Sequence, residues 1–224
     1  MSKILGIECA GASLSVAVLE GEKTLAFELV TAPSGYPEIL VPTVQKVIEK
    51  AGIAYGDLDL IAAGRGAGSF TGVRIALATA SAIAMVTDKP ALGISNFAAA
   101  AFMIDEKTRA AADMIIAAIE TRRADFYIAA FTPDLTPLGE PATLTADKVK
   151  DMLKGKVLIA GDAAQRLRDE LAALLPSPAD VTVAVAKDTV PTAETIAKYA
   201  LYNQGANLPL TPLYVSPAHV TCKH

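Results

Sequence analysis

The chain has 224 residues, of which 52% are hydrophobic and 5% aromatic, so it can bury a core built mainly from Ala, Leu, Ile and Val. Its formal net charge is -4 and no basic run exceeds Arg122-Arg123, which argues against strong nucleic-acid binding by this chain alone. The apolar start is interrupted at Glu8, too soon for a signal peptide or a membrane span, and Cys9 and Cys222 predict no disulfide. We therefore expect a cytoplasmic protein.

The first hundred residues predict strands and helices in the order βββαβαβα. Three β-rich runs form two successive hairpins, and a helix follows that ends at Gly52, with Pro42 in its first turns. A strand, a glycine-rich turn and a long apolar helix come next, before another strand and helix. The predicted ranges are 4–8, 13–20, 24–29, 39–51, 60–63, 71–86, 91–94 and 96–103.

A charged stretch at 105–109 predicts the start of a second lobe. We expect strands at 114–119, 126–131, 157–160 and 181–185, and helices at 145–153, 162–175 and 192–205, with Thr145 and Asp162 as helix caps. The domains predicted are 1–104 with the helix 192–205 packed on it, 105–191 as the second lobe, and an irregular tail over 206–224.

The glycine-rich turn is the most distinctive motif of the chain. Its marked residues are Gly64, Gly66, Gly68, Ser69, Thr71, Gly72 and Arg74. It is neither a dinucleotide fingerprint nor a phosphate-binding P-loop, because the third glycine and the Gly-Lys-Ser/Thr sequence are both missing. Two interpretations remain open: an anion cradle at a helix N-terminus, or a tight backbone turn with Ser69 or Thr71 as the helix cap.

Catalytic and metal-binding sets are hard to assemble from this sequence. The only histidines, His219 and His224, lie in the tail near Cys222, where three ligand-type residues do not predict a metal site. Glu8 closes the first strand, where a carboxylate could hold a metal-bound phosphate or could bond the N–H groups of the turn that follows. The other carboxylates near strand ends are Asp57, Asp59, Glu120, Asp125 and Asp162.

A combination of motifs spread over the whole chain resembles the TsaB family, also called YeaZ. These motifs are Glu8-Cys9-Ala10 with Ser15-Val16-Ala17, the segment Gly64 to Arg74, Thr121-Arg122-Arg123 before Phe126-Tyr127, and Pro212-Leu213-Tyr214. The resemblance implies an α/β fold with two lobes of the actin, sugar-kinase and Hsp70 type, which is ribonuclease H-like. It also implies a noncatalytic paralogue of TsaD, the subunit that transfers threonylcarbamoyl to the adenosine beside the anticodon of certain tRNAs.

The resemblance further implies the partners. They are TsaD in a heterodimer, the ATPase TsaE, a second copy when TsaD is absent, and tRNA indirectly through the complex. We predict no membrane contact, no metal and no cofactor, and whether a nucleotide binds between the lobes stays open. In the family the helices corresponding to 36–51 and 71–86 meet the partner. The interface residues that we predict are Leu40, Val44, Val47, Val73, Leu77, Ala80 and Ala84.

The sequence departs from the family at several positions. Asn96 and Ala100 stand where TsaD carries its metal-binding histidine pair, and Glu8 stands where related proteins usually have Asp. Tyr36-Pro37-Glu38 and Tyr214-Val215-Ser216 also differ from the common His-Ser-Glu and Tyr-Leu-Arg. An alternative function stays open, that of an ATP-dependent phosphotransferase or a glycoprotease-like enzyme of the same fold, with Gly161-Asp162-Ala163 as a weak nucleotide loop.

Overall fold

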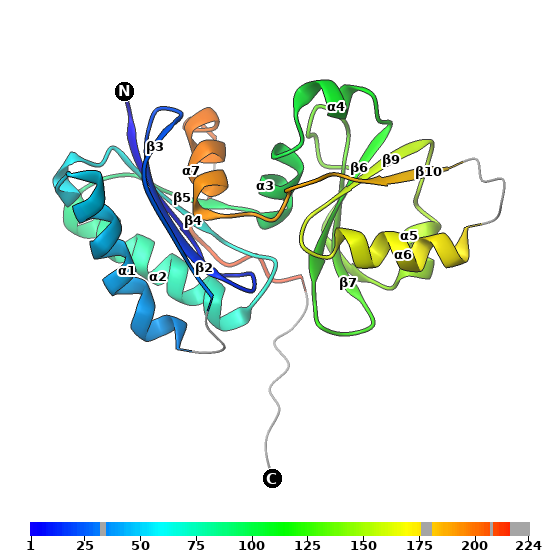
Figure 1. Ribbon diagram of the computed structural model, residues 1–224, viewed down its shortest axis with the longest axis horizontal. Coiled ribbons are helices and arrows are strands. Elements are labelled where there is room, and N and C mark those ends of the chain that lie inside the picture. Colours follow the sequence, from blue (N-terminus) through cyan, green and yellow to red (C-terminus); the bar gives the residue numbers. More distant parts are fainter. Residues whose placement is uncertain (32–34, 176–180, 207, 216–224) are drawn as a thin grey trace, which may run out of the picture.

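The computed structural model describes residues 1–31, 35–175, 181–206 and 208–215, which form two lobes, each built on a five-stranded sheet (Figure 1). The first sheet has the order β3-β2-β1-β4-β5 and the second β10-β9-β6-β7-β8. The first contains β1 (Lys3–Glu8), β2 (Leu14–Glu20), β3 (Lys23–Val30), β4 (Leu60–Gly64) and β5 (Ala91–Ile94). The second contains β6 (Met114–Glu120), β7 (Phe126–Phe131), β8 (Ala142–Leu144), β9 (Lys156–Ala160) and β10 (Thr182–Val185).

The first sheet is covered on both faces, which explains why β1 and β4 are apolar along almost their whole length. The two hairpins predicted at the N-terminus are confirmed, since β1–β2 and β2–β3 pair antiparallel, whereas β1, β4 and β5 run parallel. Helices α1 (Tyr36–Ala51) and α2 (Phe70–Thr87) lie on one face, and α7 (Ala193–Tyr202) lies on the other (Figure 1).

Helix α1 begins three residues earlier than its apolar pattern predicts and ends at Gly52 in the left-handed conformation, as predicted. Pro42 lies in the second turn of the helix, within its first turns as predicted, but beyond the first turn, in which a missing N–H would cost little. Thr43 Oγ1 donates a 2.8 Å hydrogen bond to the Ile39 carbonyl in the same stretch, so one carbonyl near the proline gains a side-chain partner.

The second lobe carries α5 (Ala146–Lys150) and α6 (Ala164–Leu174), which pack together and build its core with the sheet. Helix α3 (Asn96–Phe102) lies between the lobes and packs on β6, β7 and α7, and the short helix α4 (Glu106–Ala110) follows it on the second lobe (Figure 1). The predicted cap Asp162 is wrong: α6 starts after Ala163, and Asp162 instead accepts a hydrogen bond from the Glu120 N–H. The short elements α4, β8 and η1 (Tyr55–Asp57) were not predicted.

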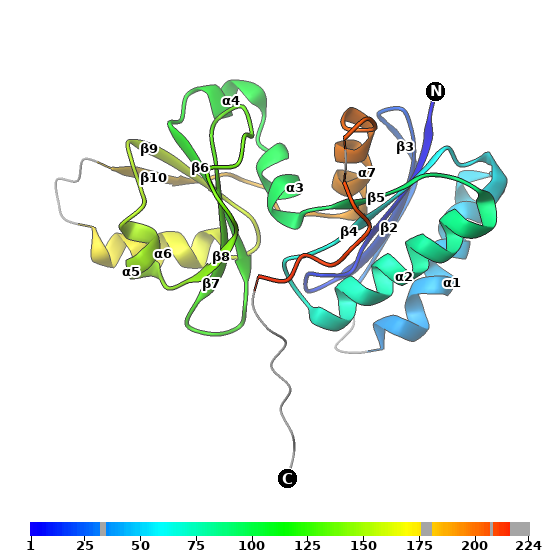
Figure 2. The same cartoon turned by 180° about the vertical axis from the view of Figure 1, so that it is seen from behind.

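The chain returns to the first lobe at its end. Helix α7 packs on β1, β2 and β4, and the Ala193 N–H donates to Ser15 Oγ at 2.9 Å. Beyond it, residues 208–215, here called the C-terminal strap, cross the first lobe (Figure 2, red). The strap is irregular, as predicted, yet it is tied down by hydrogen bonds from the Gly93 N–H to the Leu208 carbonyl and from the Leu213 N–H to the Arg65 carbonyl.

Candidate functional site

The glycine-rich turn joins β4 to α2 and uses its hydrogen-bonding groups within the chain. Ser69 is the N-cap of α2, as one of the two sequence interpretations predicted, and its hydroxyl accepts from the Gly72 N–H at 3.2 Å. The Ser69 N–H donates to the Ala10 carbonyl at 2.8 Å, and the Gly66 N–H donates to Asn96 Oδ1 at 3.1 Å. These bonds use up polar groups that an anion would need. They therefore favour the interpretation as a backbone turn that holds the start of α2, and not that as an open anion cradle.

Two of its glycines are required by close backbone approach. A Cβ on Gly72 would overlap the Cys9 carbonyl, and a Cβ on Gly68 would overlap the backbone of Ala10. Gly68 also has φ of +140°, a conformation that side chains rarely adopt. The first turn of α2 can therefore lie directly against the loop between β1 and β2.

Glu8 ends β1 beneath this turn and is only 2% exposed. Its Oε1 accepts from the Ala10 N–H at 2.5 Å, whereas Oε2 has no hydrogen-bond partner of good geometry among the described residues. Burial raises the pKa of Glu8 to about 7, although the nearby Ala10 N–H and Asn96 amide offset part of that effect. A Cβ on Gly64 would overlap Glu8 Oε2, so the glycine makes room for this carboxyl group.

Glu8 thus turns inward and offers no carboxylate to a metal-bound phosphate in the space between the lobes. No group of three His, Cys, Asp or Glu side chains arranged to hold a metal ion occurs within residues 1–31, 35–175, 181–206 and 208–215. The tail residues His219, Cys222 and His224 lie outside the described residues. Glu8 is therefore not available as a ligand of the metal-bound nucleotide that a sugar-kinase-like fold implies.

A cleft of about 980 Å³ separates the lobes. One wall consists of the β1–β2 loop, the start of α1 and the start of α2, including Ser69 and Thr71. The opposite wall contains Thr121, Arg122, Tyr127 and other residues of the second lobe. Because backbone and uncharged polar groups dominate the first wall, the charged side chains of the cleft come mainly from the second lobe.

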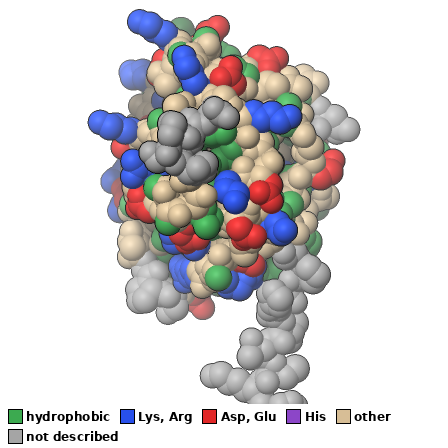
Figure 3. Space-filling model, turned by 90° about the vertical axis from the view of Figure 1, so that its right-hand side faces the viewer, with side chains coloured by type: hydrophobic (Ala, Val, Ile, Leu, Met, Phe, Trp, Pro, Cys, Tyr) green, Lys and Arg blue, Asp and Glu red, His purple; other side chains and the backbone are tan. Residues whose placement is uncertain are grey.

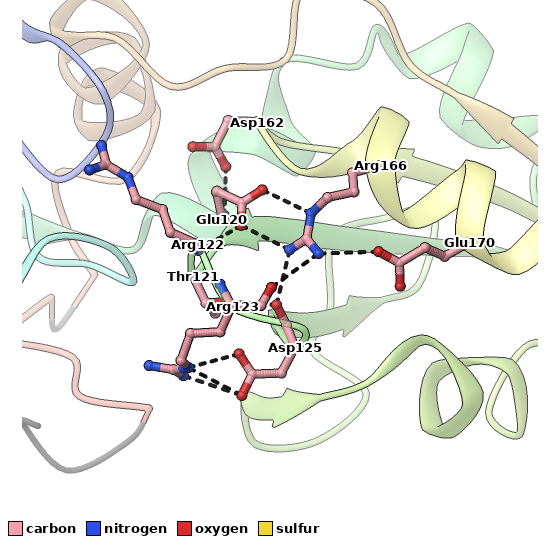
Figure 4. Close-up of polar contacts among 8 residues, drawn as sticks. All are labelled: Glu120, Thr121, Arg122, Arg123, Asp125, Asp162, Arg166 and Glu170. Atoms are coloured by element: carbon pink, nitrogen blue, oxygen red, sulfur yellow. Dashed lines mark hydrogen bonds and ion pairs between the residues drawn. The ribbon is translucent and has the colours of Figure 1, made fainter.

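The second-lobe wall is organised by Arg166 of α6. Its guanidinium donates to both carboxylate oxygens of Glu120 at 2.8 and 3.0 Å, to the carbonyls of Arg123 and Asp125, and to Glu170 (Figure 4). These hydrogen bonds from one guanidinium hold the turn between β6 and β7 against α6. The sequence analysis did not single out Arg166, because a lone arginine on a helix carries no motif.

Arg122 occupies the tip of that turn with φ of +60°. Its backbone N–H donates to Glu120 Oε1 at 2.7 Å, while its guanidinium extends away from the network, toward the ribbon of the first hairpin (Figure 4). The guanidinium has no ion-pair partner among the described residues. Arg123, in contrast, is paired with Asp125 at 3.1 Å.

The predicted glycine-turn residue Arg74 lies in an aromatic cluster with the C-terminal strap. Its guanidinium carbon lies 3.6 Å from the Phe70 ring centroid, and its Nε donates to the Tyr214 hydroxyl at 2.9 Å. The rings of Phe70 and Tyr214 are 5.5 Å apart and remain 38% and 48% exposed. We call Phe70, Arg74 and Tyr214 the aromatic clasp.

The structure corrects the predicted interface residues. Six of the seven are at most 6% exposed and pack inside the first lobe, so they offer little surface to another protein, although Val44 also lines the groove between α1 and α2. These six are Leu40, Val44, Val47, Val73, Leu77 and Ala80. Ala84 is partly buried against the same core. The apolar periodicity of α1 and α2 therefore marks the side that faces their own sheet.

The second half of α2 is also apolar on its outer side, and Val41 of α1 adjoins it, whereas most other exposed residues of α1 are polar or charged. Val41, Met85 and Val86 are 59%, 81% and 86% exposed. They flank or line a groove of about 540 Å³ between the helices, to which Ala78 and Ala82 contribute. The register could have identified these residues, because Val41 lies one position from Leu40 and Ala78, Ala82 and Val86 follow one another at intervals of four.

Two lobes with a cleft between them, and with helices on both faces of the first sheet, define the class of this protein. It has an actin- and sugar-kinase-like fold. YeaZ from Pseudomonas aeruginosa has the same fold, with a TM-score of 0.72, 24% identity, and coverage of 96% of this chain and 100% of that one. The ROK hexokinase from Thermus thermophilus superposes with a TM-score of 0.50 and 14% identity, covering 89% of this chain and 97% of that one, which shows the fold alone.

The family model described as "TsaD: tRNA N6-adenosine threonylcarbamoyltransferase" matches residues 31–210. The chain belongs to this family, and within it to the TsaB (YeaZ) group. The "tRNA threonylcarbamoyladenosine biosynthesis protein TsaB" of Escherichia coli (strain K12) is 33% identical over 133 residues, which cover 59% of this chain and 56% of that protein. The matched stretch spans about half the length of the curated TsaB relatives.

Proposed function

We propose that the chain is a noncatalytic partner subunit that binds a TsaD-family protein and supports the transfer of threonylcarbamoyl to the tRNA adenosine beside the anticodon. Membership in the TsaB group supports a role in threonylcarbamoyladenosine biosynthesis. The observation that carries the partner role is the exposed apolar surface formed by Val41 of α1 and by Ala82, Met85 and Val86 of α2. Exposed aliphatic side chains that adjoin one groove are typical of a protein contact surface.

This face has the properties of an assembly surface. Ala78 and Ala82 are small, so a partner helix can approach the backbone of α2 closely, while Val41, Met85 and Val86 supply apolar area. Burial of apolar surface contributes about 25 cal/mol per Å², and a stable interface covers about 800 Å² on each partner. We therefore place the partner on this outer face.

The hydropathy of helix α2 is also compatible with a membrane span. Among the described residues it is the one helix long and apolar enough to cross a membrane by length and composition. Its inner side, however, packs on β4 and β1 of the first lobe, and its start is fixed by the Ser69 cap. These contacts favour an interface helix in a cytoplasmic complex over a membrane span.

The chemistry of the described residues supports a noncatalytic role. The Glu8 carboxylate is buried and accepts a hydrogen bond from the Ala10 N–H. Burial raises the pKa of the Cys9 thiol, which opposes its use as a nucleophile. We propose TsaE as a further partner. When the TsaD-family protein is absent, a second copy of the chain binds the same face. The proposed role requires no bound cofactor. The TsaD-family protein then supplies the catalytic groups.

The test is assembly with the TsaD-family protein of the same organism. Mixed in equal amounts, the two chains should co-elute as a heterodimer by size exclusion with light scattering, and tRNA modification should rise when both are present. Ala82→Arg and Val86→Arg, both at exposed positions, should abolish co-elution while leaving the circular dichroism spectrum unchanged. Ala80 is unsuitable for this purpose because it is fully buried.

Ala172→Arg provides the matched control, since it adds the same side chain at an exposed position of α6. It should co-elute like the unmodified chain. Co-elution of both Ala82→Arg and Val86→Arg at full strength would place the interface elsewhere. Tight binding of ATP and magnesium with turnover, measured by calorimetry and product analysis, would count against the noncatalytic role.

A further inference from the structure

The two sheets are built alike, but the outer edges of their last parallel strands differ. In each sheet a central strand, β1 or β6, is followed by two parallel strands, which are β4 and β5 in the first lobe and β9 and β10 in the second. The edge of β5 is covered by the C-terminal strap, whose Leu208 carbonyl accepts from the Gly93 N–H at 3.1 Å. No segment within residues 1–31, 35–175, 181–206 and 208–215 pairs with the outer edge of β10.

The outer edge of β10 offers backbone groups to a further strand. The N–H groups of Thr182 and Ala186 donate to carbonyls on the β9 side, at 3.0 and 2.9 Å. Since successive residues of a strand direct their N–H groups to opposite edges, those of Val183 and Val185 point away from the sheet. The run 181–186 contains no charged residue and no proline, which are the residues that commonly protect an edge.

The two remaining outer strands are protected. On β3, Glu28 forms ion pairs with Lys46 and Lys50 of α1, so charged side chains surround that edge. Strand β8 is three residues long and directly follows Pro141. Short strands, charges and prolines all discourage pairing with another chain. Among the described strands, β10 is therefore the one whose edge is best suited to pairing with another chain.

A pocket of about 560 Å³ adjoins this edge. Val183 and Val185 pack toward α6 in the core of the second lobe, so Thr182 and Ala184 face the opposite side of the sheet, where they line the pocket with Leu158 of β9. Helix α3 packs mainly on β6 and β7, whereas α7 packs on all five strands of the first sheet, so this side of β10 stays exposed. A strand added to β10 can direct alternate side chains into the pocket.

The charged side chains that line the pocket are Lys107 of α4 and Lys156 of β9. Both are exposed, and neither has an ion pair among the described residues. No carboxyl group is part of the lining: Asp105 caps α4, Asp113 accepts from the Lys156 N–H at 2.8 Å, and Glu106 lies outside the pocket. Basic and acidic side chains are interspersed over the outer end of the second lobe (Figure 3), so the unpaired state of the two lysines distinguishes this pocket.

We propose that β10 binds an extended segment of a partner protein, which adds a strand to the second sheet and places acidic side chains in the pocket against Lys107 and Lys156. In this mode the backbone hydrogen bonds give affinity and the alternate side chains give selectivity. A second copy of the chain fits less well, because its own run 181–186 carries no carboxylate to meet the lysines. The surface lies on the second lobe, away from α1 and α2, and does not depend on the proposed function (Figure 1).

The experiment measures fluorescence anisotropy of a labelled, blocked octapeptide in which Val and Glu alternate, titrated with the full chain. This peptide should bind at least about tenfold more tightly than one in which Lys replaces Glu, because like charges then meet in the pocket. Lys156→Glu and Lys107→Glu should each weaken binding of the Glu peptide by about tenfold and strengthen binding of the Lys peptide. Lys148→Glu is the matched control, since it makes the same charge change at an exposed position of α5, and it should bind both peptides like the unmodified chain.

Alternate N-methylation of the peptide tests strand addition without altering the protein. Methyl groups on the Val amides block one edge of the peptide strand, and methyl groups on the Glu amides block the other. One of the two methylated peptides should lose binding and the other should keep it, because a strand added to β10 uses a single edge. Equal effects of the two methylation patterns would overturn the inference, and this result does not require any variant to fold.

Three other outcomes would also overturn it. Equal binding of the Glu and Lys peptides, or equal losses in Lys156→Glu and Lys148→Glu, would remove the role of the lysines. Displacement of the Glu peptide by an equal concentration of glutarate would assign the pocket to a free carboxylate. A dimer of the chain alone that Val183→Pro dissociates, measured by light scattering, would assign the edge to a second copy.

Assembly with the TsaD-family protein separates this inference from the proposed function. Ala82→Arg, which should abolish co-elution with that protein, should bind the Glu peptide like the unmodified chain. Lys156→Glu should show the opposite behaviour, with co-elution retained and peptide binding weakened. A failure of either interaction is therefore read independently of the other.

Discussion

Glu8 is a carboxyl group in a place that water does not reach, and its titration couples to folding. Its pKa is about 7 in the folded chain and 4.5 as the ordinary value, so between these pH values the folded state keeps a proton that the unfolded state has lost. The free energy of unfolding should therefore fall as the pH rises through this window, by about 3 kcal/mol in total, and level off above it.

Glu8→Gln tests this coupling, because the amide keeps the shape of the side chain and cannot ionise. Urea unfolding at pH 5 and pH 8 should show the variant gaining about 2.5 kcal/mol relative to the unmodified chain as the pH rises. Glu140→Gln, at an exposed position, should show no such relative gain. If Glu8→Gln and the unmodified chain kept a constant difference in stability across this range, the Glu8 carboxyl would already be ionised in the folded state.

At the scale of elements, the position of the start of α2 depends on Gly72 having no side chain. Gly72 lies against the Cys9 carbonyl, so Gly72→Ala must lift α2 from the β1–β2 loop or displace that loop. We expect a loss of about 3 kcal/mol in the free energy of unfolding. Gly56→Ala is the control, because a Cβ there meets no atom within 4 Å, and it should change stability by less than about 0.5 kcal/mol. Equal stability of the two variants would show that α2 is not seated by this contact.

The sequence predicts long elements well because apolar periodicity extends over several turns or strands, as in α2 and the first two hairpins. It fails for α4 and β8, which are too short to carry a period. It also fails for the interface residues, because periodicity reports which side of α1 is buried and not what buries it. Leu40 and Val41 are both apolar, so apolar character without the helical register does not tell the core residue from the exposed one.

In the candidate site, too, local features can be predicted from the sequence and long-range contacts cannot. The glycine turn and its Ser69 cap follow from local sequence, because turn chemistry acts over a few residues. The contacts of Arg166 with Glu120, and of Arg74 with Tyr214, join residues 46 and 140 positions apart. No local pattern encodes such pairs, so the cleft walls become visible only when the two lobes are assembled.

At the scale of the whole molecule, the last described helix in the sequence, α7, packs on the first lobe, so the first lobe is complete only after the second lobe has been passed in the sequence. Helix α7 covers the face of the first sheet opposite to α1 and α2 (Figure 1), and its Ala193 carbonyl lies so close to Gly6 that a Cβ there would overlap it. The buried residues of this layer include Ile4, Leu19 and Ile196. Without α7 these strands would expose one apolar face to water, and the first lobe would lose one of its two cores.

A pair of truncated chains tests this dependence. A chain ending at residue 190 lacks α7 and the C-terminal strap, whereas a chain ending at 206 lacks only the strap and the residues after it. By hydrogen exchange, the amides of β1 and β4 should lose protection in the shorter chain, while β6 and β9 keep theirs because the second lobe has its own core. The longer chain should protect all four strands. Protection of β1 in the chain ending at 190 would mean that the first lobe folds without the helix that covers it.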